Sequence, residues 1–246
     1  MNKGLILLST VAFIFQGIAS FGQSQTYLSL YRDQLPYFQE LITGAHYEDP
    51  PNSYVGHPYL YGRDFQDGIL TINNVSYTDV PLLYNMHEDE LVTFHPIYLK
   101  KIRIKPEKVE EFQMEDGGLF RRFSENPNYP PHKNGFYEVV SDGMIKVLVK
   151  HYKKKTVYRE TGRVTYTFLA SEDFFYWWSG EFAQIKNGNQ AMKALGLTKK
   201  DIRHFIRTQG LDRNLSLQEY LVRLVNLSQS PEVEFSGFAK QKGYDN

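Results

Sequence analysis

The stretch that decides the fold runs from Gly135 to Leu169 and has the sequence GFYEVVSDGMIKVLVKHYKKKTVYRETGRVTYTFL. In its middle, Ile145, Val147 and Val149 occupy alternate positions, and such alternation of β-branched residues is typical of a half-buried strand. The opposite face of that strand would carry Lys146, Leu148, Lys150 and Tyr152. The stretch therefore predicts antiparallel strands with one face toward a core.

Turn residues divide this stretch into three strands. Asp142-Gly143 stands before the central strand, where we expect a hairpin turn with a positive φ at the glycine. Alternation returns from Arg163 to Phe168, and Gly162 marks the preceding turn. Together these features predict a β-meander.

Composition supports a folded, mainly β chain with a sizeable core. The 246 residues are 41% hydrophobic and 15% aromatic, with 18 Tyr and 17 Phe, which are common in strands. The formal net charge is zero. Because cationic side chains supply most non-specific affinity for phosphate backbones, we expect no nucleic-acid partner.

The first 22 residues have the pattern of a secretory signal peptide. Lys3 is the charged start, residues 4–15 are mostly apolar, and the small residues Ser20 and Gly22 predict cleavage before Gln23. A membrane anchor is the alternative, but the apolar run is shorter than about 20 spanning residues. No second apolar span follows, so we expect a mature chain without a transmembrane segment. It would be periplasmic, associated with the outer membrane, or extracellular.

The chain contains no cysteine. This excludes disulfides, thiolate metal sites, a thiol nucleophile and a lipid-modified cysteine at the cleavage site. An exported domain of this composition must be held together by its core and its polar contacts.

We expect five segments along the chain. After the signal peptide, residues 23–62 form a helix or linker and a loop. Residues 63–187 form an antiparallel β domain, either a sandwich or a curled, barrel-like sheet, because short strands alternate with polar turns at regular spacing. Residues 188–229 form a small helical unit, and residues 230–246 form a flexible tail. Two β modules divided at the proline-rich residues 126–134 are the alternative.

Several turns and helix caps within these segments can be assigned to particular residues. Asn73-Asn74, residues 85–89, Gly117-Gly118 and Ser179-Gly180 each predict a connection between paired strands. In the helical unit, Thr198 with Asp201 and Ser216 with Glu219 have capping-box spacing, and Gly210 fits a C-terminal cap.

Four pieces of the sequence carry a resemblance. They are GILTINNVSYTDVPLLYN from residue 68, ELVTFHP from residue 90, KPEKVEEFQM from residue 105 and GFYEVVSDGMIKVLVK from residue 135. With the helix pair that follows, this layout resembles a group of exported β-rich envelope proteins of Bacteroidetes-type bacteria that have no assigned activity. The resemblance implies export and a β-rich fold, and it implies no catalytic residue.

No motif for a reaction, a metal or a cofactor stands out. The seven histidines are scattered, and only His87 and His95 could meet across a strand pair, beside the acidic residues 88–90. Carboxylates at Asp64, Asp67 and residues 88–90 could form an acid–base pair, although solvated turns explain them equally. We therefore predict no catalytic residue, no metal site and no cofactor.

Two surface features are candidate contact sites. A set of lysines follows the central strand: Lys146, Lys150, Lys153, Lys154 and Lys155. They would either protect a sheet edge from pairing or contact anionic lipid headgroups. In the aromatic run of residues 174–178, alternation would bury one set and expose Phe175 and Trp177 for a partner, unless the whole run packs in the core.

The sequence thus predicts an exported, non-enzymatic envelope accessory or protein-interaction protein, with envelope proteins or anionic lipid headgroups as partners. The alternative is a hydrolase that acts on envelope or dietary polymers.

Overall fold

The computed structural model describes residues 44–51, 53–95, 98, 100–115, 117–160, 163–203 and 215–229. The chain divides into two compact units, Met1–Thr43 and Gly44–Asn246, and every described residue belongs to the second unit. The expected signal peptide, the first part of the expected helix or linker, the turn at Gly162, the cap at Gly210 and the flexible tail lie outside the described residues.

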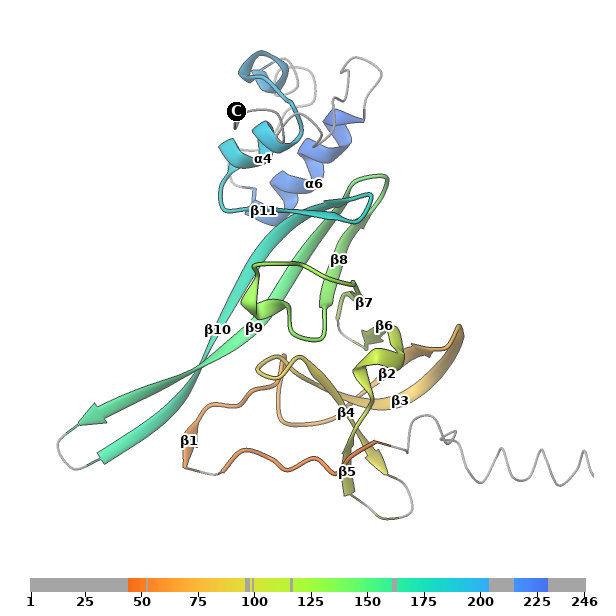
Figure 1. Cartoon of the computed structure of the whole chain (residues 1–246), viewed down its shortest axis with the longest axis vertical. Coiled ribbons are helices and arrows are strands. Elements are labelled where there is room, and N and C mark those ends of the chain that lie inside the picture. The colour runs from red at the N-terminus through yellow and green to blue at the C-terminus, as the bar shows by residue number, and fades with distance from the viewer. Residues whose placement is uncertain are drawn as a thin grey trace, which may run out of the picture. The chain divides into compact units, whose positions relative to one another are not determined.

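The described strands of this unit form one large mixed sheet that is not closed (Figure 1). Its order is β1-β10-β9-β8-β7-β6-β2-β3-β4-β5, and β11 pairs with β10 beside this path. The strands are β1 Tyr54–Val55, β2 Gln66–Ile72, β3 Val75–Asn85, β4 Glu90–His95, β5 Lys100–Arg103, β6 Val109–Met114, β7 Leu119–Arg122, β8 Phe136–Asp142, β9 Lys146–Glu160, β10 Arg163–Trp178 and β11 Glu181–Ile185. The mainly β prediction is confirmed, whereas the expected barrel-like closure is not observed among these strands.

The meander predicted around the lysine strand is formed by β8, β9 and β10, which pair antiparallel. The expected turn geometry at Gly143 is wrong. Three residues, 143–145, join β8 to β9, and Gly143 has no positive φ. A register shift between Val139 and Ser141 accompanies this longer connection. By contrast, Asn73-Asn74 and Ser179-Gly180 both have positive φ at both residues, as two-residue hairpin turns require.

Helices cover one face of the long strands. α4, Gly188–Ala194, and α6, Leu217–Ser228, bury aliphatic residues against β8, β9, β10 and β11. Ser216 and Glu219 form the predicted capping box of α6. Thr198 and Asp201 form the second predicted box, at the start of the helical residues 199–203.

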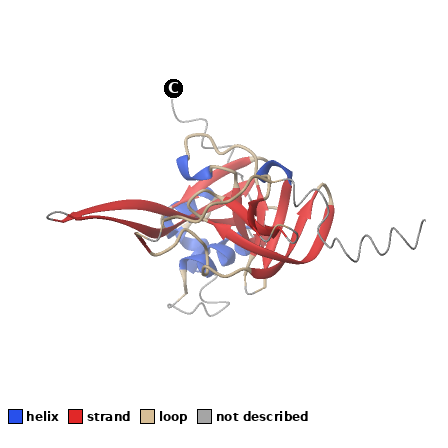
Figure 2. Cartoon of the chain, turned by 90° about the horizontal axis from the view of Figure 1, so that it is seen from below, coloured by secondary structure: helices blue, strands red, loops and turns tan. Residues whose placement is uncertain are grey.

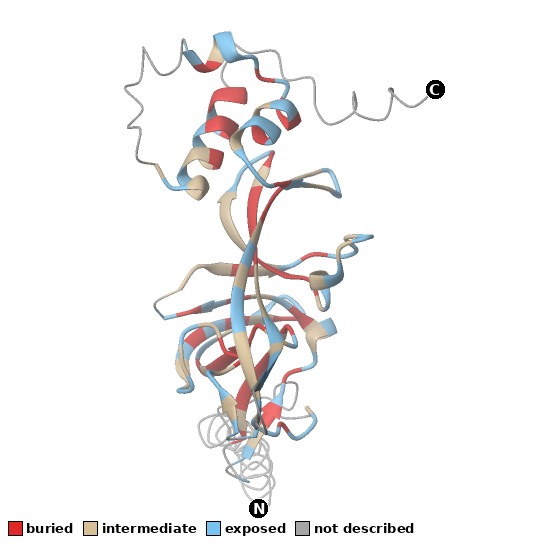
Figure 3. Cartoon of the chain, turned by 90° about the vertical axis from the view of Figure 1, so that its left-hand side faces the viewer, coloured by how far each residue is buried: buried red, intermediate tan, exposed pale blue. Residues whose placement is uncertain are grey.

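The opposite face of the same strands is also covered. Phe123, Tyr137, Leu148 and Phe175 form a separate buried cluster there. Consequently Val147, Leu148, Val149 and Lys150 of β9 are all fully buried, in the part of the β9–β10 pair that lies toward the helices (Figure 3). The half-buried strand predicted from alternation is therefore buried on both faces at its centre.

The described residues between 44 and 55 pair with both β5 and β10, and none of them is helical. Backbone hydrogen bonds join Ala45 to Arg103 and Tyr47 to Lys101 on β5. The same segment then becomes β1 and pairs parallel with β10. This connection protects parts of both sheet edges from pairing with another chain.

The proline-rich loop does not divide the sheet. It contains the 3₁₀ turn η2, Pro130–His132, and a second such turn, η1, Pro106–Lys108, precedes β6. Strands β7 and β8 on either side of the loop pair directly, with Phe120 opposite Glu138. In the described residues the sheet is therefore continuous across the loop at which the alternative of two β modules would divide it. Within them, no helix has the length and apolar character needed to cross a bilayer.

Candidate functional site

The five lysines of β9 do not all lie on the surface, as contact with anionic headgroups would require. Lys146 pairs with Asp142, and its ammonium lies 5.8 Å from the centre of the Trp177 ring. The Lys153 ammonium donates hydrogen bonds to the carbonyls of His57 at 2.9 Å and Tyr59 at 2.6 Å. Of the five lysines, only Lys154 and Lys155 are exposed.

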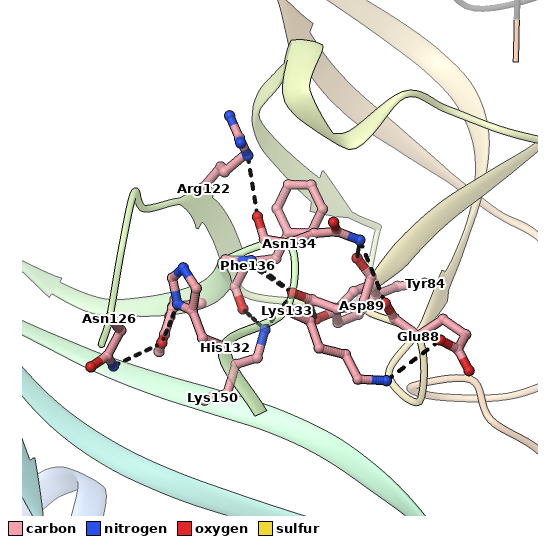
Figure 4. A network of polar contacts seen from close by, with 12 residues as sticks. Tyr84, Glu88, Asp89, Arg122, Asn126, His132, Lys133, Asn134, Phe136 and Lys150 are labelled. Atoms are coloured by element: carbon pink, nitrogen blue, oxygen red, sulfur yellow. Dashed lines mark hydrogen bonds and ion pairs between the residues drawn. The ribbon is translucent and has the colours of Figure 1, made fainter. Parts of the chain in front are cut away.

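Lys150 is fully buried, which corrects the expectation that it contacts an anionic surface. Its ammonium lies 2.7 Å from the Asp89 carboxylate, and the exposed fractions of the two side chains are 0% and 1% (Figure 4). The ammonium also donates to the carbonyl of Phe136 at 2.8 Å and lies 5.1 Å from the centre of the Tyr137 ring. Burial lowers the pKa of Lys150, although the Asp89 carboxylate opposes this effect.

The Asp89 carboxylate accepts three further hydrogen bonds. The Tyr84 hydroxyl donates to one oxygen at 2.5 Å. The backbone amides of Gly135 and Phe136 donate to the other oxygen at 2.8 Å and 3.4 Å. Burial raises the pKa of Tyr84 well above its usual value, so this hydroxyl remains a proton donor. Asp89 itself has a positive φ of 61°, which the tight turn between β3 and β4 imposes.

Aromatic rings enclose this polar cluster. The rings of Phe112 and Phe120 are stacked, with centres 4.9 Å apart, and each lies 5.3 Å from the ring of Tyr84. Phe136 meets Tyr84 edge to face. The ion pair is therefore shielded from water. In such surroundings its electrostatic interaction is strong, and an unpaired charge would be costly.

The aromatic run of β10 packs mainly in the core. Phe175 is 1% exposed and belongs to the buried cluster opposite the helices. Trp177 is partly buried and contacts Phe123 at a ring separation of 5.4 Å. The alternative of plain core packing is confirmed for residues 174–176, and the expected exposure of Phe175 is wrong because both faces of β10 are covered here.

The distal part of β9 and β10 is the exposed feature of the strand pair. β8 pairs with β9 only as far as Val149, whereas β9 and β10 remain paired up to Glu160 and Arg163. This two-stranded arm of β9 and β10, residues 154–160 and 163–169, extends past β8 (Figure 2), and the short strand β1 pairs with it at Tyr166 and Thr167. It exposes large apolar side chains, each between 44% and 55% accessible: Val157, Tyr158, Val164 and Leu169.

Both faces of the arm carry these side chains. Val164 lies opposite Arg159, and Leu169 lies opposite Lys154, so the two residues point to different faces. The Lys155 ammonium lies 4.5 Å and 4.6 Å from the ring centres of Tyr54 and Tyr166, and donates to the Tyr54 hydroxyl at 2.6 Å. The arm thus carries aromatic and cationic side chains that contact one another, together with apolar side chains that remain exposed.

A polar pocket of about 370 Å³ lies between the arm, the segment of residues 47–54 and the turn after β3. Glu90 lines it, and burial raises the pKa of this carboxyl above its usual value although the Arg103 guanidinium lies 3.5 Å away. Tyr47, Tyr59 and Asp49 form a hydrogen-bonded chain at the same place, with distances of 3.1 Å and 2.5 Å. Most polar groups of the pocket therefore bind one another.

His87 and His95, the two histidines that could meet across a strand pair, each contact a backbone group instead. His87 places Nδ1 2.8 Å from the carbonyl of Lys153, and His95 accepts the backbone amide of Tyr98 at 3.2 Å. In the part of the chain that the structure describes, no three histidine, aspartate or glutamate side chains gather as metal ligands do.

No family model, curated protein sequence or solved structure matches this chain. The Asp89–Lys150 cluster is the feature that sequence reasoning missed. The available signal was a lysine directly after three consecutive aliphatic strand residues, Val147 to Val149, since a cation at the end of such a run needs a buried partner if both faces are covered.

Proposed function

We propose that this chain is an exported, non-enzymatic envelope protein that binds a protein partner through its two-stranded arm. The observation that carries the proposal is the exposure of Val157, Tyr158, Val164 and Leu169 on paired strands that few other described residues cover. The signal-peptide pattern of residues 1–22 supports export.

Exposed apolar side chains gathered on one element favour burial by a partner. Beyond the short strand β1, which pairs with Tyr166 and Thr167, the arm is a two-stranded ribbon. Such ribbons are only marginally stable in water, so a partner that covers the arm would add stability. Lys154 and Arg159 stand among the apolar residues and are exposed. Each face of the arm thus carries two exposed apolar side chains and one of these cations, a mixture that fits a protein surface with acidic groups beside apolar ones.

The test is capture of partners from solubilised envelope with the full chain and two variants. The arm variant replaces Val157, Tyr158 and Val164 with Ser. The matched control replaces Ile69 and Val75, which are 44% and 49% exposed on β2 and β3. We expect a stoichiometric protein to bind the wild type and the control, and to bind the arm variant at least tenfold more weakly. Equal capture by all three proteins contradicts the proposal.

An anionic lipid surface is the alternative to a protein partner. It would appear as co-sedimentation with anionic vesicles that falls as salt rises and is lost in the Lys154→Gln, Lys155→Gln variant. That result, without a protein partner, would replace the proposed partner by a lipid surface.

A hydrolase is the second candidate, and the pocket beside Glu90 is the observation that favours it. A partly buried carboxyl with a raised pKa is the type of group that donates protons in glycan hydrolysis. Turnover of a glycan or peptide library by the purified chain, abolished by Glu90→Gln, would establish this candidate. Absence of turnover leaves partner binding as the proposed function.

A further inference from the structure

The buried contact between Lys150 and Asp89 has the geometry of a reaction as well as of an ion pair. An amine and a carboxyl are held 2.7 Å apart, both out of contact with water and enclosed by aromatic rings. The 2.7 Å distance joins the Lys150 nitrogen to a carboxylate oxygen, so the nitrogen is also held beside Cγ, the atom to which that oxygen is bonded. Groups fixed in contact in this way behave as a pair at very high effective concentration. Removal of solvent also favours the neutral amine of Lys150 over its ammonium.

We propose that Lys150 and Asp89 join in an intramolecular amide bond, a covalent cross-link between β9 and the turn after β3. The proton balance of the step closes without a cofactor. The ammonium first passes one proton to the carboxylate, which gives a neutral amine and a carboxylic acid. The Lys150 nitrogen then forms a bond to Cγ of Asp89, and the oxygen that lies against Tyr84 leaves as water. This water takes the acid proton and a second proton from the nitrogen.

The surrounding groups match each part of this step. The amides of Gly135 and Phe136 point at the second carboxylate oxygen and would stabilise the negative charge that develops on it, as in an oxyanion hole. The Tyr84 hydroxyl points at the departing oxygen and can relay a proton to it. The Phe136 carbonyl, 2.8 Å from the Lys150 nitrogen, orients the amine.

The same groups would form hydrogen bonds with the amide product. The new amide N–H would donate to the Phe136 carbonyl, and the new carbonyl would accept from the amides of Gly135 and Phe136. A neutral amide with partners for both polar atoms removes the cost of two buried charges. In a chain without cysteine, the bond would supply the covalent tie that a disulfide cannot.

Mass spectrometry of the full chain, unfolded and digested, tests the proposal directly. We expect the peptides that contain Asp89 and Lys150 to be recovered as one branched species, lighter than their sum by one water molecule. Fragmentation should locate the bond between these two side chains. Recovery of both peptides as separate linear species in full yield would overturn the proposal, whatever the behaviour of any variant.

Two variants and a control define the chemistry. Lys150→Arg keeps the charge but lacks a nucleophilic amine, so the branched species should be absent. Asp89→Asn should give a branched species of the same mass as the wild type, because ammonia then leaves in place of water. Lys153→Arg, on the same strand but bound to backbone carbonyls, should leave the cross-link unchanged. A branched species that persists in Lys150→Arg would assign the bond elsewhere and overturn the proposal.

Discussion

At the scale of single residues, Gly135 occupies a position that other residues cannot share. Its φ is +84°, and an added Cβ would lie 2.2 Å from the carbonyl oxygen of Phe123, which is backbone and cannot yield easily. Its amide also holds the Asp89 carboxylate. We expect Gly135→Ala to lower the free energy of unfolding by about 2–4 kcal/mol, measured by urea denaturation.

Gly143 provides the matched control. It has no positive φ, and a Cβ there would meet no atom closer than 3.6 Å. Gly143→Ala should change the free energy of unfolding by less than about 0.5 kcal/mol. Equal effects of the two substitutions would contradict the strained geometry assigned to Gly135.

Glu90 gives a prediction for pH dependence. Burial raises its pKa above the ordinary value of 4.5 despite the nearby Arg103. A carboxyl with a raised folded-state pKa contributes stability below its unfolded pKa, and this contribution is lost as the pH rises through the folded-state pKa. Glu90→Gln, which cannot ionise, should therefore raise the Tm at neutral pH. The difference should disappear below about pH 4, and a Tm gain that is independent of pH would exclude this cause.

At the scale of elements, α6 depends on contacts with the sheet more than on its own propensity. Its capping box supports the first turn, but a helix of 12 residues is marginal alone in water. Leu221 is fully buried in the core between the helices and the sheet. We expect Leu221→Ala to cost about 2–5 kcal/mol of unfolding free energy, and Arg223→Ala on the exposed side to cost less than about 0.5 kcal/mol.

At the scale of the whole unit of residues 44–246, pairing continues across the proline-rich loop, from Phe120 on β7 to Glu138 on β8. Strands joined in one ladder and sharing cores should unfold together. Fluorescence of Trp177 and Trp178, both on β10, and far-ultraviolet circular dichroism should give coincident urea transitions. Two separated transitions would instead favour modules that meet at residues 126–134.

Local rules in the sequence predicted many elements correctly. The paired strands around Asn73-Asn74 and Ser179-Gly180 and the capping boxes at Thr198 and Ser216 depend on the backbone preferences of a few neighbouring residues. The turn at Gly143 was predicted with the wrong geometry, because the register shift in β8 changes the length of the connection.

The candidate sites were harder to predict, because period-two alternation shows which side chains share a face but not what covers that face. Lys150 and Phe175 were expected on exposed faces, yet a second cluster covers the face opposite the helices. The partner of Lys150 is Asp89, in a turn far from it in the sequence. No local pattern joins these two residues.

The sequence by itself therefore determined the β-rich character, the main hairpins and the helix caps, since each arises from interactions between near neighbours. Only the tertiary structure decided that Lys150 is buried against Asp89 and that apolar residues of the arm remain uncovered. Both outcomes depend on which distant strands pair and where that pairing stops. Burial and proximity are properties of the assembled sheet, and they arise only after segments far apart in the chain have come together.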